Sequence, residues 1–208
     1  VAIIFFLVVR EPPRRATPHS AEPKTFFKGV GELLKTRSYL LVVLAGSCSA
    51  INQGAHLTWG PTFLSRVRDL GPQDIGVYFG TLRGVAGLMG ALLAAVVIGA
   101  LVRRDLRWQI RMAILVAALP FFSDLTFLFA GNPAVWQTGL ALSALLTQFT
   151  VAASYPLYVN VAPNNLRATA SAFYFLVATL TGFVIGPFSV GALNDNFNNL
   201  GFAIVGVF

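Results

Sequence analysis

The sequence predicts an all-α membrane protein, and three observations lead to that prediction. Hydrophobic residues make up 56% of the 208 residues and charged residues only 11%, whereas about 25% of the residues in soluble domains are charged. The hydrophobic residues gather in five runs that are long enough to cross a bilayer, since a spanning helix needs about 20 residues. The sequence lacks the alternation of polar and apolar residues that a membrane β-barrel would need.

The chain is expected to contain five complete spans. They cover residues 39–64, 75–101, 112–130, 136–159 and 168–193. Turn or charge signals such as Gly71-Pro72 and Pro163-Asn164-Asn165 separate these runs. Residues 1–9 and 200–208 are apolar but too short to cross a membrane. We therefore expect the chain to be a fragment that includes the end of one further helix and the start of another.

Positive charge is distributed unevenly between the loops. The net charge of +7 would suggest a nucleic-acid partner in a soluble protein, but here the basic residues lie between apolar runs. Twelve of the 15 Lys and Arg residues lie in segments 10–38, 102–111 and 160–167. The positive-inside rule places these three segments on the cytoplasmic side of a plasma (inner) membrane. Nucleic acid is not expected as a partner.

Segment 10–38 is the longest loop. Its first part is basic and proline-rich, whereas apolar residues recur at helical spacing later: Phe26, Phe27, Val30, Leu33 and Leu34. This spacing predicts a short amphipathic helix at the cytoplasmic interface, where it would join two helical bundles or contact membrane lipids. The alternative is a solvated linker.

The first predicted span carries polar residues on one face. Cys48, Asn52, His56 and Trp59 share this face, and Gln53 lies beside them. A lipid-facing helix would not present Asn, Gln and His together, because buried polar groups are costly. The face could line a hydrated pathway, with His56 as a hydrogen-bonding or proton-linked group. Hydrogen bonding between helices is the other interpretation.

Two charged residues lie inside later spans. Arg83 and Asp124 are at similar depths from the outer side, and each requires a compensating partner. They could pair with each other, or Arg83 could bind an anionic headgroup. The span that contains Arg83 also has a face of small residues suited to close helix packing: Gly76, Gly80, Gly84, Gly87 and Gly90.

Polar and aromatic residues also mark the fourth and fifth spans. They are Thr147, Gln148, Thr150, Ser154, Tyr155, Tyr158, Ser171, Tyr174 and Thr181. Such residues suit an amphipathic substrate as well as ordinary packing. Pro156 should kink its helix. The sequence contains no signature of a metal site, a phosphate-binding loop or a catalytic centre, so no catalytic residue, metal or cofactor is expected. A lipid-modifying membrane enzyme and a non-transporting scaffold are the rival classes.

Several short motifs occur in a familiar order. They are Arg10-Glu11-Pro12, Trp59-Gly60-Pro61-Thr62-Phe63-Leu64-Ser65-Arg66, Pro163-Asn164-Asn165-Leu166-Arg167-Ala168, and Gly186-Pro187 followed by Gly191 and Asn194-Asp195. In these motifs the chain resembles the C-terminal half of a major facilitator superfamily transporter, and most closely the spinster-like branch. The resemblance implies a six-helix bundle truncated at both ends, with the five spans as helices seven to eleven. It also implies an N-terminal bundle as partner.

The resemblance further implies secondary transport by alternating access. The implied substrate is a small amphipathic or lipid-like organic anion, with proton coupling as one option; a multidrug or sugar-acid carrier is the alternative. Arg83 would attract the anion, and the other pathway residues would hydrogen-bond it or pack its apolar part: Asn52, Gln53, His56, Trp59, Gln148, Tyr155, Tyr158 and Tyr174. Structural or gating roles are expected for Asp124, Arg167, Gly186 and Pro187, with Arg167 capping the carbonyl end of the preceding span or making a gate contact.

Overall fold

The computed structural model describes residues 26–105, 107–197 and 199–207. The expected helix end at residues 1–9 and the proline-rich part of the loop lie outside the described residues. Every regular element described is helical: α2 (Phe26–Lys35), α3 (Arg37–Val67), α4 (Pro72–Ile75), η1 (Gly76–Leu82), α5 (Arg83–Arg104), α6 (Arg107–Phe129), α7 (Pro133–Val161), η2 (Asn164–Leu166), α8 (Arg167–Leu180), η3 (Thr181–Ile185), α9 (Gly186–Phe197) and α10 (Leu200–Val205).

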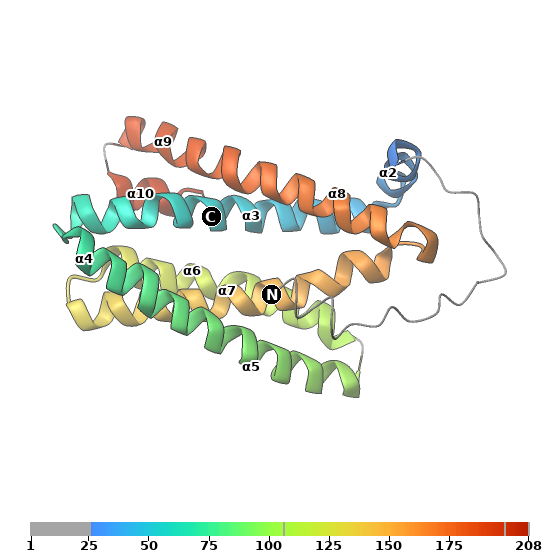
Figure 1. Cartoon of the computed structure of the whole chain (residues 1–208), viewed down its shortest axis with the longest axis horizontal. Coiled ribbons are helices and arrows are strands. Elements are labelled where there is room, and N and C mark those ends of the chain that lie inside the picture. Colours follow the sequence, from blue (N-terminus) through green and yellow to red (C-terminus); the bar gives the residue numbers. More distant parts are fainter. Residues whose placement is uncertain (1–25, 106, 198, 208) are drawn as a thin grey trace, which may run out of the picture.

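Five helical stretches in the described residues are long and apolar enough to cross a membrane. They are Arg37–Val67, Pro72–Arg104, Arg107–Phe129, Pro133–Val161 and Asn164–Phe197. The second stretch combines α4, η1 and α5, and the fifth runs from η2 to α9. All five lie roughly along the long axis of the molecule (Figure 1). The predicted all-α membrane fold is therefore confirmed, while the part of each helix that lies in the bilayer remains a prediction.

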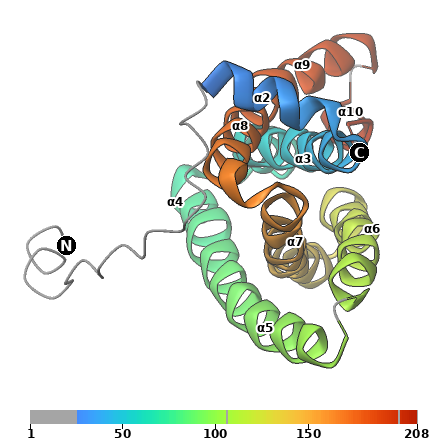
Figure 2. The same cartoon turned by 90° about the vertical axis from the view of Figure 1, so that its right-hand side faces the viewer.

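The long helices form two groups. Viewed along the helices, α3, α8 and α9 lie on one side and α5, α6 and α7 on the other (Figure 2). The largest hydrophobic cluster joins α3, α6, α7, α9 and α10 near the α4 end, around Phe63, Phe127 and Trp136. A second cluster, at the α2 end, centres on Tyr39, Tyr158 and Tyr174. Because the two clusters hold opposite ends of the bundle, polar residues can collect between them.

Glycine packing differs from the sequence prediction. An added Cβ at Gly76, Gly80 or Gly84 would meet nothing within 4 Å, so these glycines make no close helix contact in the described residues. Only the end of that face packs tightly, because a Cβ at Gly90 would lie 2.5 Å from the Leu145 carbonyl oxygen of α7. The closest backbone approach is elsewhere, between α3 and η3 at Gly54.

The amphipathic segment forms helix α2. Gly29, Val30 and Leu33 are buried, and α2 packs on α3 and α8 at one end of the bundle (Figure 1). Its outer side carries Phe27, which is 82% exposed, and the exposed Lys28. The location of α2 at the membrane interface stays a prediction.

Arg68 ties the end of α3 to the end of α6. Its Nη2 donates to the carbonyl oxygens of Phe127, Leu128 and Ala130 at 3.3, 3.3 and 2.7 Å. The guanidinium also lies 5.7 Å from the Phe63 ring centre. Burial lowers the pKa of Arg68, but arginine normally titrates so far above neutral pH that the side chain stays charged. A cation at the carbonyl end of a helix is favourable, so Arg68 caps α6.

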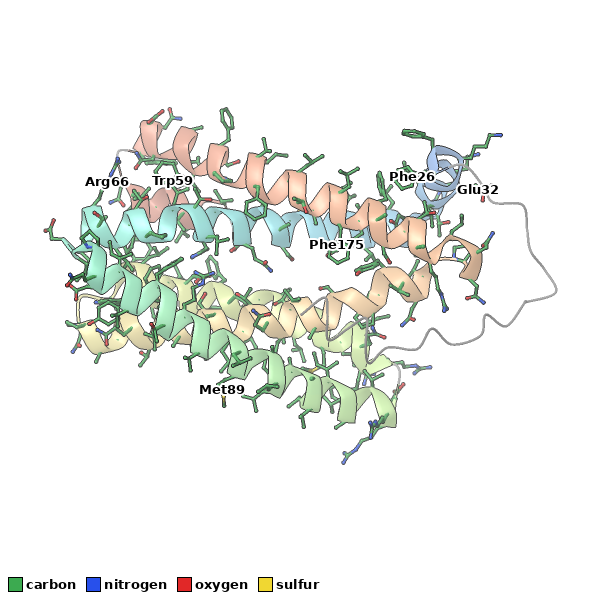
Figure 3. All side chains as sticks on the ribbon, viewed as in Figure 1. Phe26, Glu32, Trp59, Arg66, Met89 and Phe175 are labelled. Atoms are coloured by element: carbon green, nitrogen blue, oxygen red, sulfur yellow. The ribbon has the colours of Figure 1, made fainter. Side chains whose placement is uncertain are left out.

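Replacing Arg68 by Met should therefore destabilise the bundle. Hydrogen bonds from a charged donor contribute about 1.5–3 kcal/mol, which corresponds to a fall in Tm of roughly 3–12 °C for a domain of this size. Arg66→Met is the matched control, because Arg66 is exposed in the same segment (Figure 3). Thermal unfolding in detergent followed by tryptophan fluorescence measures both variants. Equal Tm values for the two variants would contradict the capping role.

Candidate functional site

A cavity of about 390 Å³ opens between the two groups of helices. Its walls come from α3, α5, α7, α8 and η3, whose arrangement is seen end-on in Figure 2. The polar part of its lining includes Gln53, Arg83, Thr147, Gln148 and Ser154, and the apolar part includes Leu57, Phe175 and Phe183. Phe175 lies on the inner side of α8, facing α7 (Figure 3). The cavity is thus polar on one part of its wall and aromatic on another.

Arg83 supplies the positive charge of this cavity. The residue follows the π-helical turn η1 directly, and π-helical turns in α-helices often occur at functional sites. Its guanidinium lies 4.7 Å from the centre of the Phe79 ring, a cation–π distance. Its Nη1 is buried and has no hydrogen-bond partner among the described residues. A buried donor without a partner is costly, so a hydrogen bond from Arg83 to an acceptor on a ligand would be favourable.

Two predicted amides share the cavity with Arg83. Gln53 comes from α3 and Gln148 from α7, and an added Cβ at Gly87 on α5 would lie 3.5 Å from Nε2 of Gln148. The Gln148 amide therefore lies directly beside the helix that carries Arg83. The structure thus brings Gln53, Arg83 and Gln148 together in the wall of one cavity, while contact of these groups with a substrate stays a prediction.

His56 lies away from the cavity, in a buried polar cluster with Asp124 and Ser143. Asp124 is 2% exposed and His56 4%. One carboxylate oxygen of Asp124 accepts a hydrogen bond from the Ser143 hydroxyl, and the other lies 3.4 Å from His56 Nε2. The sequence offered Arg83 as a direct partner for Asp124. Among the described residues the two make no ion pair within 4 Å, although their charges attract each other at longer range.

Several predicted pathway residues serve as packing groups in this conformation. Trp59 donates from Nε1 to the Pro187 carbonyl at 3.0 Å and so joins α3 to α9. Tyr158 is 4% exposed and stacks on Tyr174 with ring centres 4.2 Å apart. Tyr174 also contributes to the cavity wall. A substrate role for Trp59 and Tyr158 stays a prediction, because neither residue lines the cavity.

The remaining predicted residues have varied positions. Asn52 lines a neighbouring groove between α3, α6 and α7, which shares Gln53, Thr147 and Ser154 with the cavity wall. Val207, just beyond α10, also lines this groove. Arg167 is exposed, and within the described residues its side chain makes no capping hydrogen bond. The Tyr155 side chain lies outside the described part of the structure.

Sequence reasoning missed two kinds of functional residue. Phe175 and Phe183 carry no polar signal in an apolar run, so only the tertiary arrangement identifies them as cavity wall. Ser143 could have been singled out as a hydroxyl within an apolar span. Among the described residues, no group of three or more His, Cys, Asp or Glu side chains could hold a metal ion.

Comparisons with known proteins identify the family and the fold. Residues 1–207 match the family model described as Major Facilitator Superfamily. An MFS-type efflux pump of Mycolicibacterium smegmatis is 30% identical over 169 residues, which are 81% of this chain and 39% of the pump. Protein spinster of Drosophila melanogaster is 27% identical over 209 residues, covering 94% of this chain and 34% of that protein.

A solved structure gives the same fold. The crystal structure of a bacterial homolog to the human lysosomal transporter Spinster, in an inward-facing and unoccupied conformation, superposes with a TM-score of 0.70 at 17% identity. The match covers 94% of this chain and 42% of that one. The chain therefore spans about two fifths of the length of this structure, and a similar share of the two relatives.

Proposed function

The chain belongs to the Major Facilitator Superfamily, and on that premise we propose that it is the C-terminal half of a secondary transporter for an amphipathic or lipid-like organic anion. The family consists of membrane transporters, not enzymes. In this proposal an N-terminal bundle packs against the chain, and the two bundles rock to open the cavity to each side of the membrane in turn. The membrane is the plasma (inner) membrane, with the basic loops in the cytoplasm, and the driving ion is the proton.

The observation that carries the proposal is Arg83 itself, a cation in the cavity wall whose buried Nη1 has no hydrogen-bond partner among the described residues. A guanidinium binds carboxylate, sulfonate or phosphate groups through two parallel hydrogen bonds. Gln53 and Gln148 would donate further hydrogen bonds to the same headgroup, whereas Phe175 and Phe183 would contact an apolar tail. An anion with a hydrocarbon tail matches both parts of the wall.

The proposal is tested by uptake of radiolabelled decane-1-sulfonate into proteoliposomes that contain the intact transporter. This probe keeps its negative charge at every pH used, so its passive crossing of the bilayer is slow. We expect saturable uptake that other alkyl anions inhibit. Decyltrimethylammonium, which has the same tail and the opposite charge, should not inhibit because Arg83 would repel it.

Inhibition of uptake by other compounds also distinguishes the alternative substrate classes. Inhibition by decyltrimethylammonium as strong as that by alkyl anions would favour a multidrug carrier. Inhibition by gluconate, an acid without an apolar tail, would favour a sugar-acid carrier. Either result, or the absence of saturable uptake, would overturn the proposed substrate class.

A further inference from the structure

The His56–Asp124–Ser143 cluster is not part of the cavity wall, although it combines two titratable groups in the bundle interior. Asp124 comes from α6, His56 from α3 and Ser143 from α7. The His56 ring lies 6.5 Å from the ring of Phe127, a residue of the main hydrophobic cluster. A carboxylate in such surroundings is costly unless nearby groups compensate its charge. Its state of charge therefore depends on those neighbours.

The charged and titratable neighbours of the cluster can be assigned element by element. Helix α5 contributes Arg83, whose charge interacts with both Asp124 and His56. Element η1 contributes Tyr78, which packs edge-on against Trp136 of α7. The end of α3 contributes Arg68, which is engaged with carbonyl oxygens at the end of α6. Helix α7 contributes Tyr158, which stacks on Tyr174 in the cluster at the α2 end, and α9 contributes Asp195, which is exposed. Elements η3 and α10 contain no titratable residue. Arg83 is thus the cation that connects the cluster with the cavity.

Arg83 has two possible electrostatic partners on different sides. Its positive charge is compensated by the negative charge of Asp124, at a distance beyond a direct ion pair. An anion bound at Arg83 in the cavity would bring a second negative charge to the same guanidinium. The buried region would then hold one uncompensated negative charge, and uptake of one proton by the cluster would restore neutrality.

We propose that His56 and Asp124 form a proton-binding site that takes up one proton when an anion binds at Arg83. The proposal rests on the function proposed above, and it names the residues that would couple the proton to the anion. The proton enters between His56 Nε2 and the facing carboxylate oxygen of Asp124, which lie 3.4 Å apart. No covalent bond forms or breaks. Because coupling between two binding events is reciprocal, lower pH must also strengthen anion binding.

Proton uptake on anion binding tests the proposal directly. The intact transporter in nanodiscs is placed in weakly buffered solution with a pH-sensitive dye, and decane-1-sulfonate is added. Since the probe itself does not titrate, any proton taken up is bound by the protein. We expect about one proton per bound anion in the pH range where the cluster titrates, and an affinity that rises by up to about tenfold for each unit that pH is lowered.

Variants at His56 and Asp124 test whether the proton binds to these two residues. Asp124→Asn combined with His56→Gln should still bind the anion, without proton uptake and with an affinity that does not change with pH. His19→Gln is the control, because His19 is the other histidine of the chain, and it should behave like the wild type. Proton uptake by the double variant at the wild-type level would overturn the assignment.

The wild type alone also decides the question if the double variant does not fold. Anion binding without proton uptake would overturn the proton site and leave the proposed function intact. A failure of the wild type to bind or transport decane-1-sulfonate would instead overturn the proposed substrate class, whatever the state of the cluster.

Discussion

Replacing Arg83 by Gln in the intact transporter is expected to weaken binding of decane-1-sulfonate by about 10- to 100-fold. A charge-assisted hydrogen bond contributes about 1.5–3 kcal/mol, and each 1.4 kcal/mol changes affinity about tenfold. Gln keeps some hydrogen-bonding capacity but has no charge, so the anion would be left without a counter-charge in the cavity. Equilibrium binding to the purified transporter in nanodiscs measures the effect.

Two further variants separate loss of the anion site from loss of folding. Arg83→Lys keeps the charge and loses the planar fork, so its affinity should lie between those of the wild type and the Gln variant. Arg103→Gln removes a positive charge from the exposed end of the same helix and should leave binding unchanged. Binding by Arg83→Gln at the wild-type level would show that Arg83 serves only to compensate Asp124.

The charge balance inside the bundle provides a second control. Arg83→Gln leaves the Asp124 carboxylate with less compensation, so the variant could lose stability as well as affinity. Adding Asp124→Asn removes the uncompensated negative charge. The double variant should recover thermal stability but not anion affinity. Recovery of both would mean that the first loss arose from folding alone.

The fold could be predicted because bilayer thickness and helix geometry constrain it strongly. Five apolar runs of sufficient length gave the class and order of the spans, since only helices satisfy every backbone group within such a run. The amides of Gln53 and Gln148 and the charge of Arg83 stood out for the same reason, as polar groups that lipid would penalise. The structure places these three residues around one cavity.

The direction of each side chain could not be predicted in the same way. His56 shares a helical face with Asn52 in the sequence, yet the structure puts His56 beside Asp124 and Asn52 in the groove next to the cavity. Helix crossings and the π-helical turns decide which side chains meet, and neither leaves a clear mark in the periodicity. The glycine pattern in the sequence gave a wrong prediction of close helix packing for a related reason. Gly76, Gly80 and Gly84 form a regular face without a packed neighbour in the described residues, while Gly54 belongs to no conspicuous repeat.

Gly54 gives the second large expected effect, in stability. An added Cβ would lie 1.7 Å from the carbonyl oxygen of Gly182 and 2.4 Å from its carbonyl carbon. At the same crossing, a Cβ at Gly186 would lie 2.4 Å from the carbonyl oxygen of Ile51. These neighbours are backbone atoms, which cannot move aside by a change of rotamer. Gly54→Ala must therefore push α3 and η3 apart along their whole contact.

We expect Gly54→Ala to destabilise the transporter by about 3 kcal/mol, the upper part of the usual range for overpacking, and to lower Tm by roughly 6–12 °C. Gly99→Ala is the matched control, because the same methyl group there meets nothing within 4 Å and alanine favours a helix interior by about 1 kcal/mol. Gly54 and Gly182 also line the cavity, so separation of the two helices should reduce anion affinity together with Tm. A Gly54→Ala variant with unchanged Tm would mean that α3 and η3 do not cross this closely. The arrangement of the cavity wall at this crossing would then be wrong.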